Sequence, residues 1–492
     1  MFSSPGRDAP SSRAFLVSVF LSLFFSITVV AQGDGTCSPT SPCVSGCCSS
    51  SGFCGFGPDY CGSTCISSCD ALAECGKYAK VPGTTCPLNV CCSQYGFCGT
   101  TTLFCDKSCQ SGCATPSKPS CSSSGNSATK KRIGYYESWS TTRKCGSWSP
   151  SDIDPTKWTH LNFAFALVDP KTFSVAQANS YDVKLYTEFT SLKNLSPSLS
   201  VFISIGGWDA GGKVFSDMVS TSANRAAFIN SLVIFMKTYA FDGVDIDWEY
   251  PIADDRGGNV ADFANYVTFL SELRSRLGSS YGITATLPSS YWYMQHFDIS
   301  KMEPYLDWFN LMTYDIHGTW DGSNPYTSAV VQAHTNLTEI DQAMDLLWRN
   351  KIPSSKVVMG LGFYGRSFTL QDSSCKTPGC PFRGGKDDAG AKPGPCTDTP
   401  GILSAAEIQD IILSKSITPV LDKQAAVKYM SWDNDQWVSY DDDETFGMKL
   451  DYANSLCLGG TMVWALDLDA VGTDKSIDNL LSTDCLGSWE GI

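Results

Sequence analysis

Basic residues are scarce in this chain of 492 residues, which has 35 Lys and Arg against 50 Asp and Glu and a net charge of −15. Nucleic acids and anionic membrane surfaces bind proteins through basic patches, so this balance argues against both as partners. A neutral, insoluble or small partner fits better. Histidine is scarcer still, with four scattered residues, and this gives little support to a zinc site. We expect no metal and no cofactor.

Long apolar runs are also rare, and the conspicuous one, residues 14–31, follows Arg7 and Arg13 at the N-terminus. This arrangement is typical of a secretory signal peptide, which we place at residues 1–31. A transmembrane anchor is the alternative, because the run approaches the ~20 residues that a bilayer needs. Residues 32–34 supply no positive stop-transfer flank. We therefore expect a secreted protein, extracellular or associated with a cell wall, with no membrane contact after signal cleavage.

Cysteine, in contrast, is abundant, and secretion allows the 23 cysteines to be interpreted as disulfides. Sixteen fall in two sets of eight, at residues 35–70 and 73–114. From Cys47 in the first set and Cys91 in the second, the gaps between cysteines are identical. Such a duplicated unit is too small for a hydrophobic core of its own, so disulfide bridges must hold it together.

The two sets contain "CCSSSGFCGFGPDYC" and "CCSQYGFCGTTTLFC", which resemble the hevein-type chitin-binding module. In that family a serine and three aromatic rings form a shallow platform for N-acetylglucosamine. The resemblance assigns the platform of the second module to Ser93, Tyr95, Phe97 and Phe104. In the first module it assigns Ser49, Phe53 and Tyr60. There Ser51 stands where an aromatic is expected, so we expect the second module to bind chitin better. A disulfide knob with incidental aromatics is the alternative, mainly for the first module.

The same resemblance implies how the sixteen cysteines of the modules pair. The first module would contain Cys37-Cys48, Cys43-Cys54, Cys47-Cys61 and Cys65-Cys69. The second would contain Cys75-Cys92, Cys86-Cys98, Cys91-Cys105 and Cys109-Cys113. Seven cysteines remain elsewhere, an odd number, so one of them is free or is partnered outside this group.

A Ser-, Pro- and Lys-rich stretch at residues 115–131 is expected to be a flexible, exposed linker. Beyond it, short apolar runs alternate with helical patterns. The β-like runs are "RIGYYES", "HLNFAFAL", "SVFISIGGW", "FDGVDIDWE", "ITATLPSS", "WFNLMTYD", "KVVMGLGFYG" and "GGTMVWALD". Eight such runs predict an α/β fold, a (β/α)8 TIM barrel at residues 132–485. The long connection before the eighth strand predicts an α+β insertion at about residues 368–446, which would form one wall of a cleft.

One segment after the fourth β-like run shows the period of an amphipathic helix. Its apolar residues fall at steps of three and four: Phe263, Tyr266, Val267, Leu270, Leu273 and Leu277. We expect this face to lie against the barrel.

The fourth run, "FDGVDIDWEYP", contains more carboxylates than a buried strand should. Side chains alternate along a strand, so Asp245, Asp247 and Glu249 share one face and point into the barrel. Burying three carboxylates without partners costs several kcal/mol or more, so they must share protons, bind cations or serve catalysis. A structural acid ladder and a divalent-metal site are the alternatives. The run has no Lys or Arg, and metal sites usually offer more oxygen ligands, so we favour catalysis.

"DGVDIDWEYP" resembles the D-x-x-D-x-D-x-E signature of glycoside hydrolase family 18, and "SIGGW" resembles its companion on the third strand. The resemblance implies a retaining, substrate-assisted mechanism, in which the 2-acetamido carbonyl of the substrate attacks the anomeric carbon. Glu249 would be the general acid and then the base for water. Asp247 would hold the acetamide N–H. Asp245 would share a proton with Asp247, helped by Tyr135 and Ser204.

The same resemblance completes a substrate pocket. Tyr314 would donate to the acetamide carbonyl oxygen, and Asp315 would bind the distorted sugar. Further substrate contacts would come from Trp464 as the floor, Trp208 on the leaving-group side, Arg366 on the glycon side, and Met312. For the tryptophans, packing alone is the alternative.

Together these features imply a secreted chitinase, with endo cleavage favoured, that binds chitin and N-acetylglucosamine oligomers and acts as a monomer. One rival is a non-catalytic chitin-binding lectin, against which the presence of Glu249 argues. The other is an endo-β-N-acetylglucosaminidase that acts on other N-acetylglucosamine glycans. The two N-terminal modules favour chitin over that substrate.

Overall fold

The computed structural model describes residues 35–324, 327–384 and 390–470. The expected signal peptide at residues 1–31 and Cys485 lie outside the described residues. Within the described ranges, no helix combines the length and the hydropathy that a membrane crossing requires.

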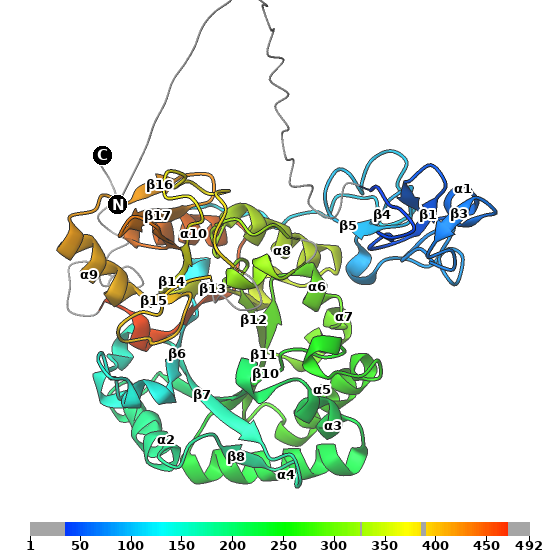
Figure 1. Ribbon diagram of the computed structural model, residues 1–492. Helices are drawn as coiled ribbons and strands as arrows, with labels where there is room; N and C mark the ends of the chain where they lie inside the picture. The colour runs from blue at the N-terminus through cyan, green and yellow to red at the C-terminus, as the bar shows by residue number, and fades with distance from the viewer. Residues whose placement is uncertain (1–34, 325–326, 385–389, 471–492) are drawn as a thin grey trace, which may run out of the picture.

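Eight parallel strands close into a barrel, with helices around the outside (Figure 1). In barrel order they are β6 (Arg132–Glu137), β7 (His160–Val168), β9 (Ser200–Gly206), β10 (Gly243–Asp247), β11 (Gly282–Pro288), β12 (Trp308–Met312), β13 (Val357–Gly362) and β19 (Gly460–Trp464). β19 pairs with β6 and closes the ring, and β8 (Val175–Gln177) adds to β7 in the antiparallel sense. Each predicted run coincides with one barrel strand, so the predicted (β/α)8 fold is confirmed.

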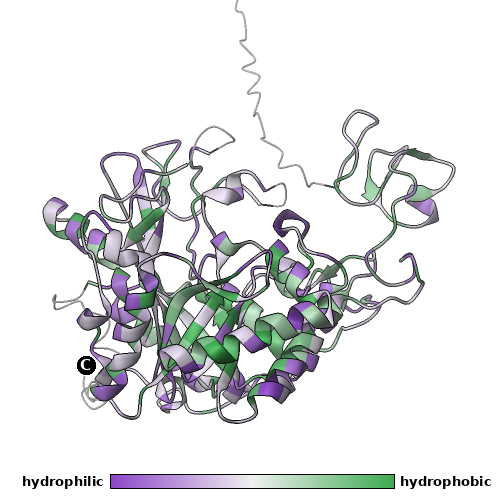
Figure 2. Ribbon diagram, turned by 90° about the horizontal axis from the view of Figure 1, so that it is seen from below, coloured by the Kyte–Doolittle hydropathy of each residue, from purple (hydrophilic) through white to green (hydrophobic). Residues whose placement is uncertain are grey.

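The helices pack their apolar faces on the strands, and the hydrophobic residues gather in the barrel and on the inner helix faces (Figure 2). These helices are α2 (Asp182–Ser191), α3 (Lys213–Val219), α4 (Ser222–Tyr239), α5 (Asp262–Leu277), α6 (Tyr291–Met294), α7 (Ile299–Met302), α8 (Leu337–Arg349) and α10 (Asp443–Ser455). The periodic segment forms α5, but its buried face is rotated slightly from the predicted one. Phe269 is buried and Phe263 is 38% exposed.

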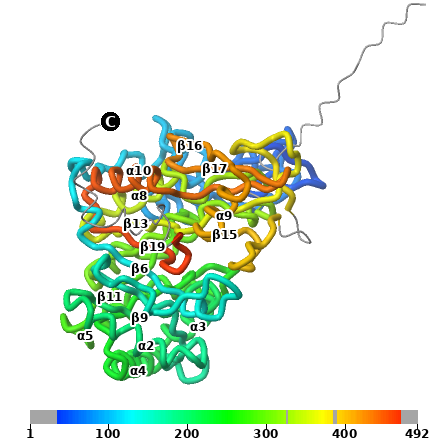
Figure 3. The backbone as a smooth tube through the Cα atoms, turned by 90° about the vertical axis from the view of Figure 1, so that its left-hand side faces the viewer, coloured from blue at the N-terminus to red at the C-terminus, as the bar shows by residue number. Residues whose placement is uncertain are grey.

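The insertion before the eighth barrel strand contains a five-stranded antiparallel sheet and the helix α9 (Ala405–Lys415). Its strands are β14 (Tyr364–Thr369), β15 (Ile402–Ser404), β16 (Val420–Asp422), β17 (Val427–Trp432) and β18 (Gln436–Tyr440). In Figure 3 β16 and β17 lie at the end of the molecule opposite α2 and α4. The insertion starts earlier than residue 368, because the chain leaves the barrel after Gly362 and Tyr364 already pairs with Ser404 of β15.

The two cysteine-rich modules have little regular structure and are held by disulfides. The first contains β1 (Cys47–Ser49), β2 (Cys54–Gly55), β3 (Cys65–Ser67) and the short α1 (Pro58–Cys61), and the second contains β4 (Cys91–Cys92) and β5 (Cys98–Gly99). Their eight bridges join the same cysteine pairs that the resemblance implies. The modules also touch each other, since the rings of Phe56 and Phe97 lie 4.9 Å apart.

The segment expected to be a flexible linker is instead fastened to the barrel. Cys121 forms a disulfide with Cys457, which follows α10. Ala128 is fully buried, and its N–H donates to the side-chain oxygen of Asn454 at 2.9 Å. The composition predicted mobility, but a covalent bond and buried contacts override it. Two further disulfides, Cys145-Cys396 and Cys375-Cys380, account for the other cysteines of the described residues.

Candidate active site

The acid-rich strand β10 has the predicted two faces. Asp245 and Asp247 are buried inside the barrel. Trp248 points the other way, because its ring packs at 5.6 Å from Phe215 of α3 and at 5.0 Å from Tyr266 of α5. The apolar side chains therefore anchor the strand to the surrounding helices, and the barrel interior receives the carboxylates.

Asp245 is held by a full set of hydrogen-bond donors. The hydroxyls of Tyr135 and Ser204 both donate to Oδ2 at 2.8 Å. Thr284 and Asn310 donate to Oδ1, at 2.6 and 3.0 Å. Burial raises the pKa of Asp245, and these hydrogen bonds oppose the rise. Tyr135 and Ser204 thus lie where the sequence predicted.

Asp247 lies in a different environment. Within the described residues its carboxylate has one side-chain donor, the hydroxyl of Thr286, at 2.5 Å. Burial, followed by the charges of Glu249 and Asp245, raises the pKa of Asp247 well above its usual range. Asp245 thus accepts four hydrogen bonds that favour its ionised form, whereas Asp247 accepts one, so a proton resides more readily on Asp247.

Glu249 follows the strand at its carboxyl end, where barrel enzymes place their reactive groups. Burial raises the pKa of Glu249 to about 7, against a hydrogen bond from Tyr250 and the charge of Arg256. Arg256 also donates from Nε to the backbone oxygen of Glu249 at 2.9 Å. A carboxyl group with this pKa can carry a proton near neutrality and can act as a general acid.

Asp315 lies just beyond β12 and is fixed by a cation. Arg366, on β14 of the insertion, forks onto both carboxylate oxygens, at 2.7 Å from Nε and 2.6 Å from Nη2. Tyr364 donates to Oδ1 at 2.5 Å. Burial acts to raise the pKa of Asp315, but Arg366 and His334 outweigh it and hold the pKa well below the usual range. Arg366 therefore orients Asp315, and its expected contact with the sugar stays a prediction. Tyr314, beside Asp315 in the sequence, is buried.

Three tryptophans, Trp139, Trp208 and Trp464, lie at or just beyond the carboxyl ends of barrel strands β6, β9 and β19. Trp464 stacks on Phe165 at 5.5 Å, and Trp139 stacks on the same ring at 6.0 Å. Trp208 is 52% exposed, with the guanidinium of Arg256 lying 3.7 Å from its ring centroid. Trp139 and Trp208 are exposed and Trp464 is half-buried, so the uncovered parts of these rings can stack on the apolar faces of sugars. Met312 ends β12 and is half-buried.

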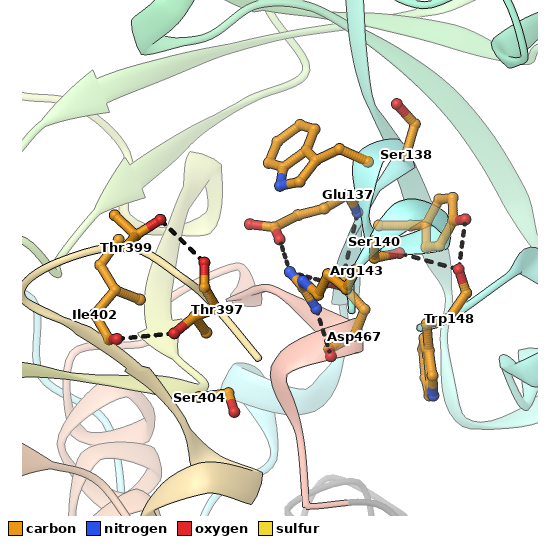
Figure 4. Close-up of polar contacts among 12 residues, drawn as sticks. Glu137, Ser138, Ser140, Arg143, Trp148, Thr397, Thr399, Ile402, Ser404 and Asp467 are labelled. Atoms are coloured by element: carbon orange, nitrogen blue, oxygen red, sulfur yellow. Dashed lines mark hydrogen bonds and ion pairs between the residues drawn. The ribbon is translucent and has the colours of Figure 1, made fainter. Parts of the chain in front are cut away.

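A second charged cluster lies where β6 and β19 end. Figure 4 shows Arg143 between Glu137 at the end of β6 and Asp467 just beyond β19. Arg143 also donates to the backbone oxygen of Asp467 at 3.0 Å. The backbone N–H of Glu137 donates to the carboxylate of Asp467 at 3.0 Å. Burial and then the charge of Asp467 raise the pKa of Glu137 well above its usual range. The cluster joins the two chain segments that bear Trp139 and Trp464.

The expected sugar platforms of the modules are only partly open. Tyr95 is 58% exposed and Phe104 is half-buried. Ser93 is buried, and its Oγ accepts from the N–H of Phe97 at 3.1 Å, while Phe97 leans on Phe56 of the first module. In the first module Phe53 is exposed, Tyr60 is half-buried, and the Oγ of buried Ser49 donates to the Phe53 carbonyl at 3.2 Å.

Several residues of the site were missed by sequence reasoning. Thr284, Thr286 and Asn310 are in neighbouring strands with side chains that point inward toward the acids. Alternation along β11 and β12 could have indicated them, because they are polar positions inside otherwise apolar runs. His334 and Tyr364 come from a loop and from the insertion. No local pattern connects them with Asp315.

Comparison with protein families gives two matches. The family described as "Glycosyl hydrolases family 18" matches residues 131–469. The family described as "Chitin recognition protein" matches residues 74–113, the second module. The first match spans more than half of the chain and contains every residue of the barrel site.

Curated relatives agree with these matches. The chain is 34% identical over 368 residues to "Secreted chitinase LysM12" of Penicillium expansum, covering 70% of this chain and 24% of that protein. It is 35% identical over 354 residues to "Chitotriosidase-1" of Mus musculus, covering 69% of this chain and 73% of that protein. The chain thus spans about a quarter of the length of the Penicillium relative.

Two solved structures share the fold. The Group IV chitinase of Ostrinia furnacalis, solved with allosamidin, has a TM-score of 0.65 and 29% identity, covering 71% of this chain and 96% of that chain. Human YKL-39, described as a pseudo-chitinase with retained chitooligosaccharide binding, has a TM-score of 0.62 and 29% identity, covering 69% and 93%. The relatives with this fold thus include an enzyme and a protein described as binding without being a true chitinase.

Proposed function

Since this chain belongs to glycosyl hydrolase family 18, we propose that it is a secreted chitinase. It hydrolyses β-1,4 links between N-acetylglucosamine residues of chitin, with retention of anomeric configuration and with cleavage inside the chain favoured. The observation that carries the proposal is the row of acids that ends in Glu249, whose pKa burial raises to about 7.

The chemistry follows from what each carboxyl group can do. Glu249 holds a proton near neutrality, so it can protonate the leaving oxygen and later remove a proton from water. Asp247 is buried, with its pKa raised and one hydrogen bond from Thr286 at 2.5 Å, so it is free to turn toward an acetamide N–H. Asp245 is pinned by its donors and can exchange a proton with Asp247 without moving. The acetamide oxygen of the substrate then serves as the nucleophile.

The surrounding residues suit a distorted N-acetylglucosamine unit. Burial and the charge of Asp247 raise the pKa of Tyr314 well above its usual range, so Tyr314 stays a hydroxyl donor for the acetamide carbonyl. Asp315 is kept ionised by Arg366 and can accept from sugar hydroxyls. Trp464 offers a flat floor, and Trp208 an exposed face on the leaving-group side.

The rest of the chain supports an extracellular chitin-degrading role. Eleven disulfides join the described cysteines, and such bridges persist in oxidising compartments. The Penicillium relative is named a secreted chitinase. Two chitin-binding modules on one chain raise the effective concentration of the barrel at a repetitive polymer. The protein acts as a monomer.

The decisive experiment compares the wild type with Glu249→Gln on chitin oligomers, with product anomers followed by NMR. We expect the variant to lose activity by roughly a thousandfold or more, because the general acid is gone, and the wild type to release the β-anomer first. Undiminished activity in the variant, or an initial α-anomer from the wild type, would refute the mechanism. A wild type that binds oligomers and releases no product would identify a lectin.

A thiazoline mimic of the cyclic intermediate tests the role of the acetamide group separately. Competitive inhibition is expected, because the mimic reproduces the fused five-membered ring of that intermediate, which Asp247 would contact. Indifference to the mimic would point to a carboxylate nucleophile instead. Product lengths from a long oligomer with one labelled end distinguish cleavage inside the chain from cleavage at its ends.

A further inference from the structure

A loop of the second chitin-binding module, between Cys86 and Cys91, packs on the barrel. The loop contains the 3-10 helix η1 (Pro87–Asn89), which packs against α8. Leu88 at its centre is 8% exposed and shares a hydrophobic cluster with the barrel core. Figure 1 shows the modules beside the barrel, on the side of α6, α7 and α8. The module is therefore docked on the barrel, and its apolar loop is part of that interface.

Two consecutive residues at the end of α8, Arg349 and Asn350, hold this loop, and we call them the latch. Arg349 donates from Nη1 to the carbonyl oxygens of Asn89 and Gly112, at 3.1 and 2.9 Å. Asn350 donates to the carbonyl oxygen of Leu88 at 2.9 Å and accepts from the Asn89 side chain at 3.0 Å. Barrel side chains thus satisfy backbone carbonyls that belong to the module, which fixes orientation as well as position.

The docking loop has features that a freely tethered module would not need. Leu88 and Asn89 have φ values of 54° and 56°. This left-handed conformation costs a bulky residue such as leucine about 1 kcal/mol or more and persists where surrounding contacts impose it. The loop between Cys86 and Cys91 is also one residue longer than its counterpart between Cys43 and Cys47 in the first module. The interface therefore uses a feature specific to the second module.

The connection to the barrel is short as well. Eight residue steps separate Cys113, the last cysteine of the module, from Cys121, which is bonded to Cys457. Fully extended, such a segment reaches at most ~27 Å. Lys118 within it forms an ion pair with Asp341 of α8 at 2.7 Å. The module is thus held from two sides, by the latch and by an anchored connection.

We propose that the second module is a fixed part of the catalytic body, and that the Arg349–Asn350 latch makes it present a bound chitin chain to the barrel at one distance and one direction. This inference rests on the proposed function. A mobile module would only raise the local concentration of polymer. A fixed module also aligns it, so the latch matters for insoluble chitin and is irrelevant to oligomers too short to reach both sites.

The test releases the latch in the full chain with Arg349→Ala combined with Asn350→Ala. The control is Arg276→Ala, which removes an exposed arginine from the last turn of α5. We expect small-angle X-ray scattering to show a larger maximum dimension for the released variant alone. Its rate on soluble chitotetraose should equal that of the wild type, which also shows that the barrel is folded. Its rate on insoluble chitin should fall about threefold or more, because alignment is lost.

Each outcome has one meaning. Scattering identical to the wild type would show that the latch does not hold the module, and would overturn the proposal. If the double variant has a larger maximum dimension but the same ratio of chitin to chitotetraose rates as the wild type, the module is released without effect on catalysis. This result would overturn the proposal that the latch aligns the chitin chain. If the wild type hydrolyses no chitin, the proposed function fails. The fixed position of the module is then tested by comparing the scattering of the wild type and the double variant, and their retention on chitin particles. If the double variant loses the oligomer rate, Asn350→Ala alone serves, with the same expected direction.

Discussion

The guanidinium of Arg256 lies over the ring of Trp208, 3.7 Å from its centroid, and the same side chain donates to the backbone oxygen of Glu249 at 2.9 Å. One arginine therefore supports the stacking surface on the leaving-group side and sets part of the electrostatic environment of the general acid. Its positive charge lowers the pKa of Glu249, which burial raises to about 7.

Arg256→Met should shift the pH dependence of catalysis. Glu249 acts as an acid, so activity is lost as pH rises through its pKa, which gives the basic limb of the profile. Without the Arg256 charge the carboxyl group keeps its proton to higher pH. We expect the basic limb of kcat/KM on chitotetraose, near pH 7 in the wild type, to move to higher pH. Arg276→Met, at an exposed site, is the control, and a limb that stays in place or moves down contradicts the assignment.

Thr284→Val should reduce kcat by weakening the support of Asp245. The Thr284 hydroxyl donates to this buried carboxylate at 2.6 Å, and a lost hydrogen bond to a buried charged group costs about 1 to 3 kcal/mol. With that support gone, the pKa of Asp245 rises further, and its proton is less available to Asp247. A fall in kcat of about tenfold to a hundredfold corresponds to this energy.

The matched control for this substitution is Thr268→Val on α5, where the hydroxyl donates to a helix carbonyl at 3.0 Å far from the acids. It should leave kcat unchanged. Urea unfolding of both variants separates a catalytic loss from a general loss of stability. Equal kcat in Thr284→Val and the wild type would mean that Asp245 does not take part in proton sharing.

The acid strand could be predicted from sequence because its information is local. Alternation alone assigns Asp245 and Asp247 to the barrel interior and Trp248 to the helices. The motif resemblance then supplied Tyr135 and Ser204, and both donate to Asp245 as expected. Alternation could have placed Asn310 inside the barrel, but its contact with Asp245 depends on the register between strands, which is set by how the whole barrel closes.

Other features that the sequence did not predict also depend on contacts between distant parts of the chain. The linker composition predicts flexibility, yet Cys121 finds Cys457 across 336 residues of sequence. The helical period of α5 suggested Phe263, but packing against the neighbouring helix buries Phe269, whose ring lies 5.5 Å from Phe228. Arg349 resembles an ordinary basic residue at a helix end. Only the docked module reveals that its hydrogen bonds go to another domain.

Glu137→Gln should change how stability depends on pH. Burial and the charge of Asp467 raise the pKa of Glu137 well above its ordinary value of 4.5. The unfolded chain releases this proton at lower pH than the folded chain, so the free energy of unfolding falls as pH rises from the unfolded pKa through the folded one. The slope for one such group is at most about 1.4 kcal/mol per pH unit.

Glutamine keeps a side-chain oxygen for Arg143 and does not titrate, so the free energy of unfolding of Glu137→Gln should fall less steeply than that of the wild type as pH rises above the ordinary glutamate pKa of 4.5. Urea midpoints at each pH give the comparison. Glu188→Gln, a change at a carboxylate whose side chain is 41% exposed, is the control. If the urea midpoints of Glu137→Gln and the wild type depend on pH in the same way, Glu137 is ionised at every pH measured and Arg143 compensates its charge.

The two modules should contribute unequally to chitin binding. Tyr95 is exposed and has Phe104 beside it in the platform assigned by resemblance, whereas the first module has Ser51 where an aromatic is expected. Burying an aromatic ring against a ligand is worth about 1.5 to 3 kcal/mol.

Tyr95→Ala, made in the inactive Glu249→Gln background so that chitin persists, should weaken retention on chitin particles about tenfold or more. Phe53→Ala should weaken it less. Leu103→Ala removes an even more exposed apolar side chain from the second module, outside its platform, and should have no effect. Equal losses from Tyr95→Ala and Phe53→Ala would show that the first module binds as well as the second, and that Ser51 does not impair it.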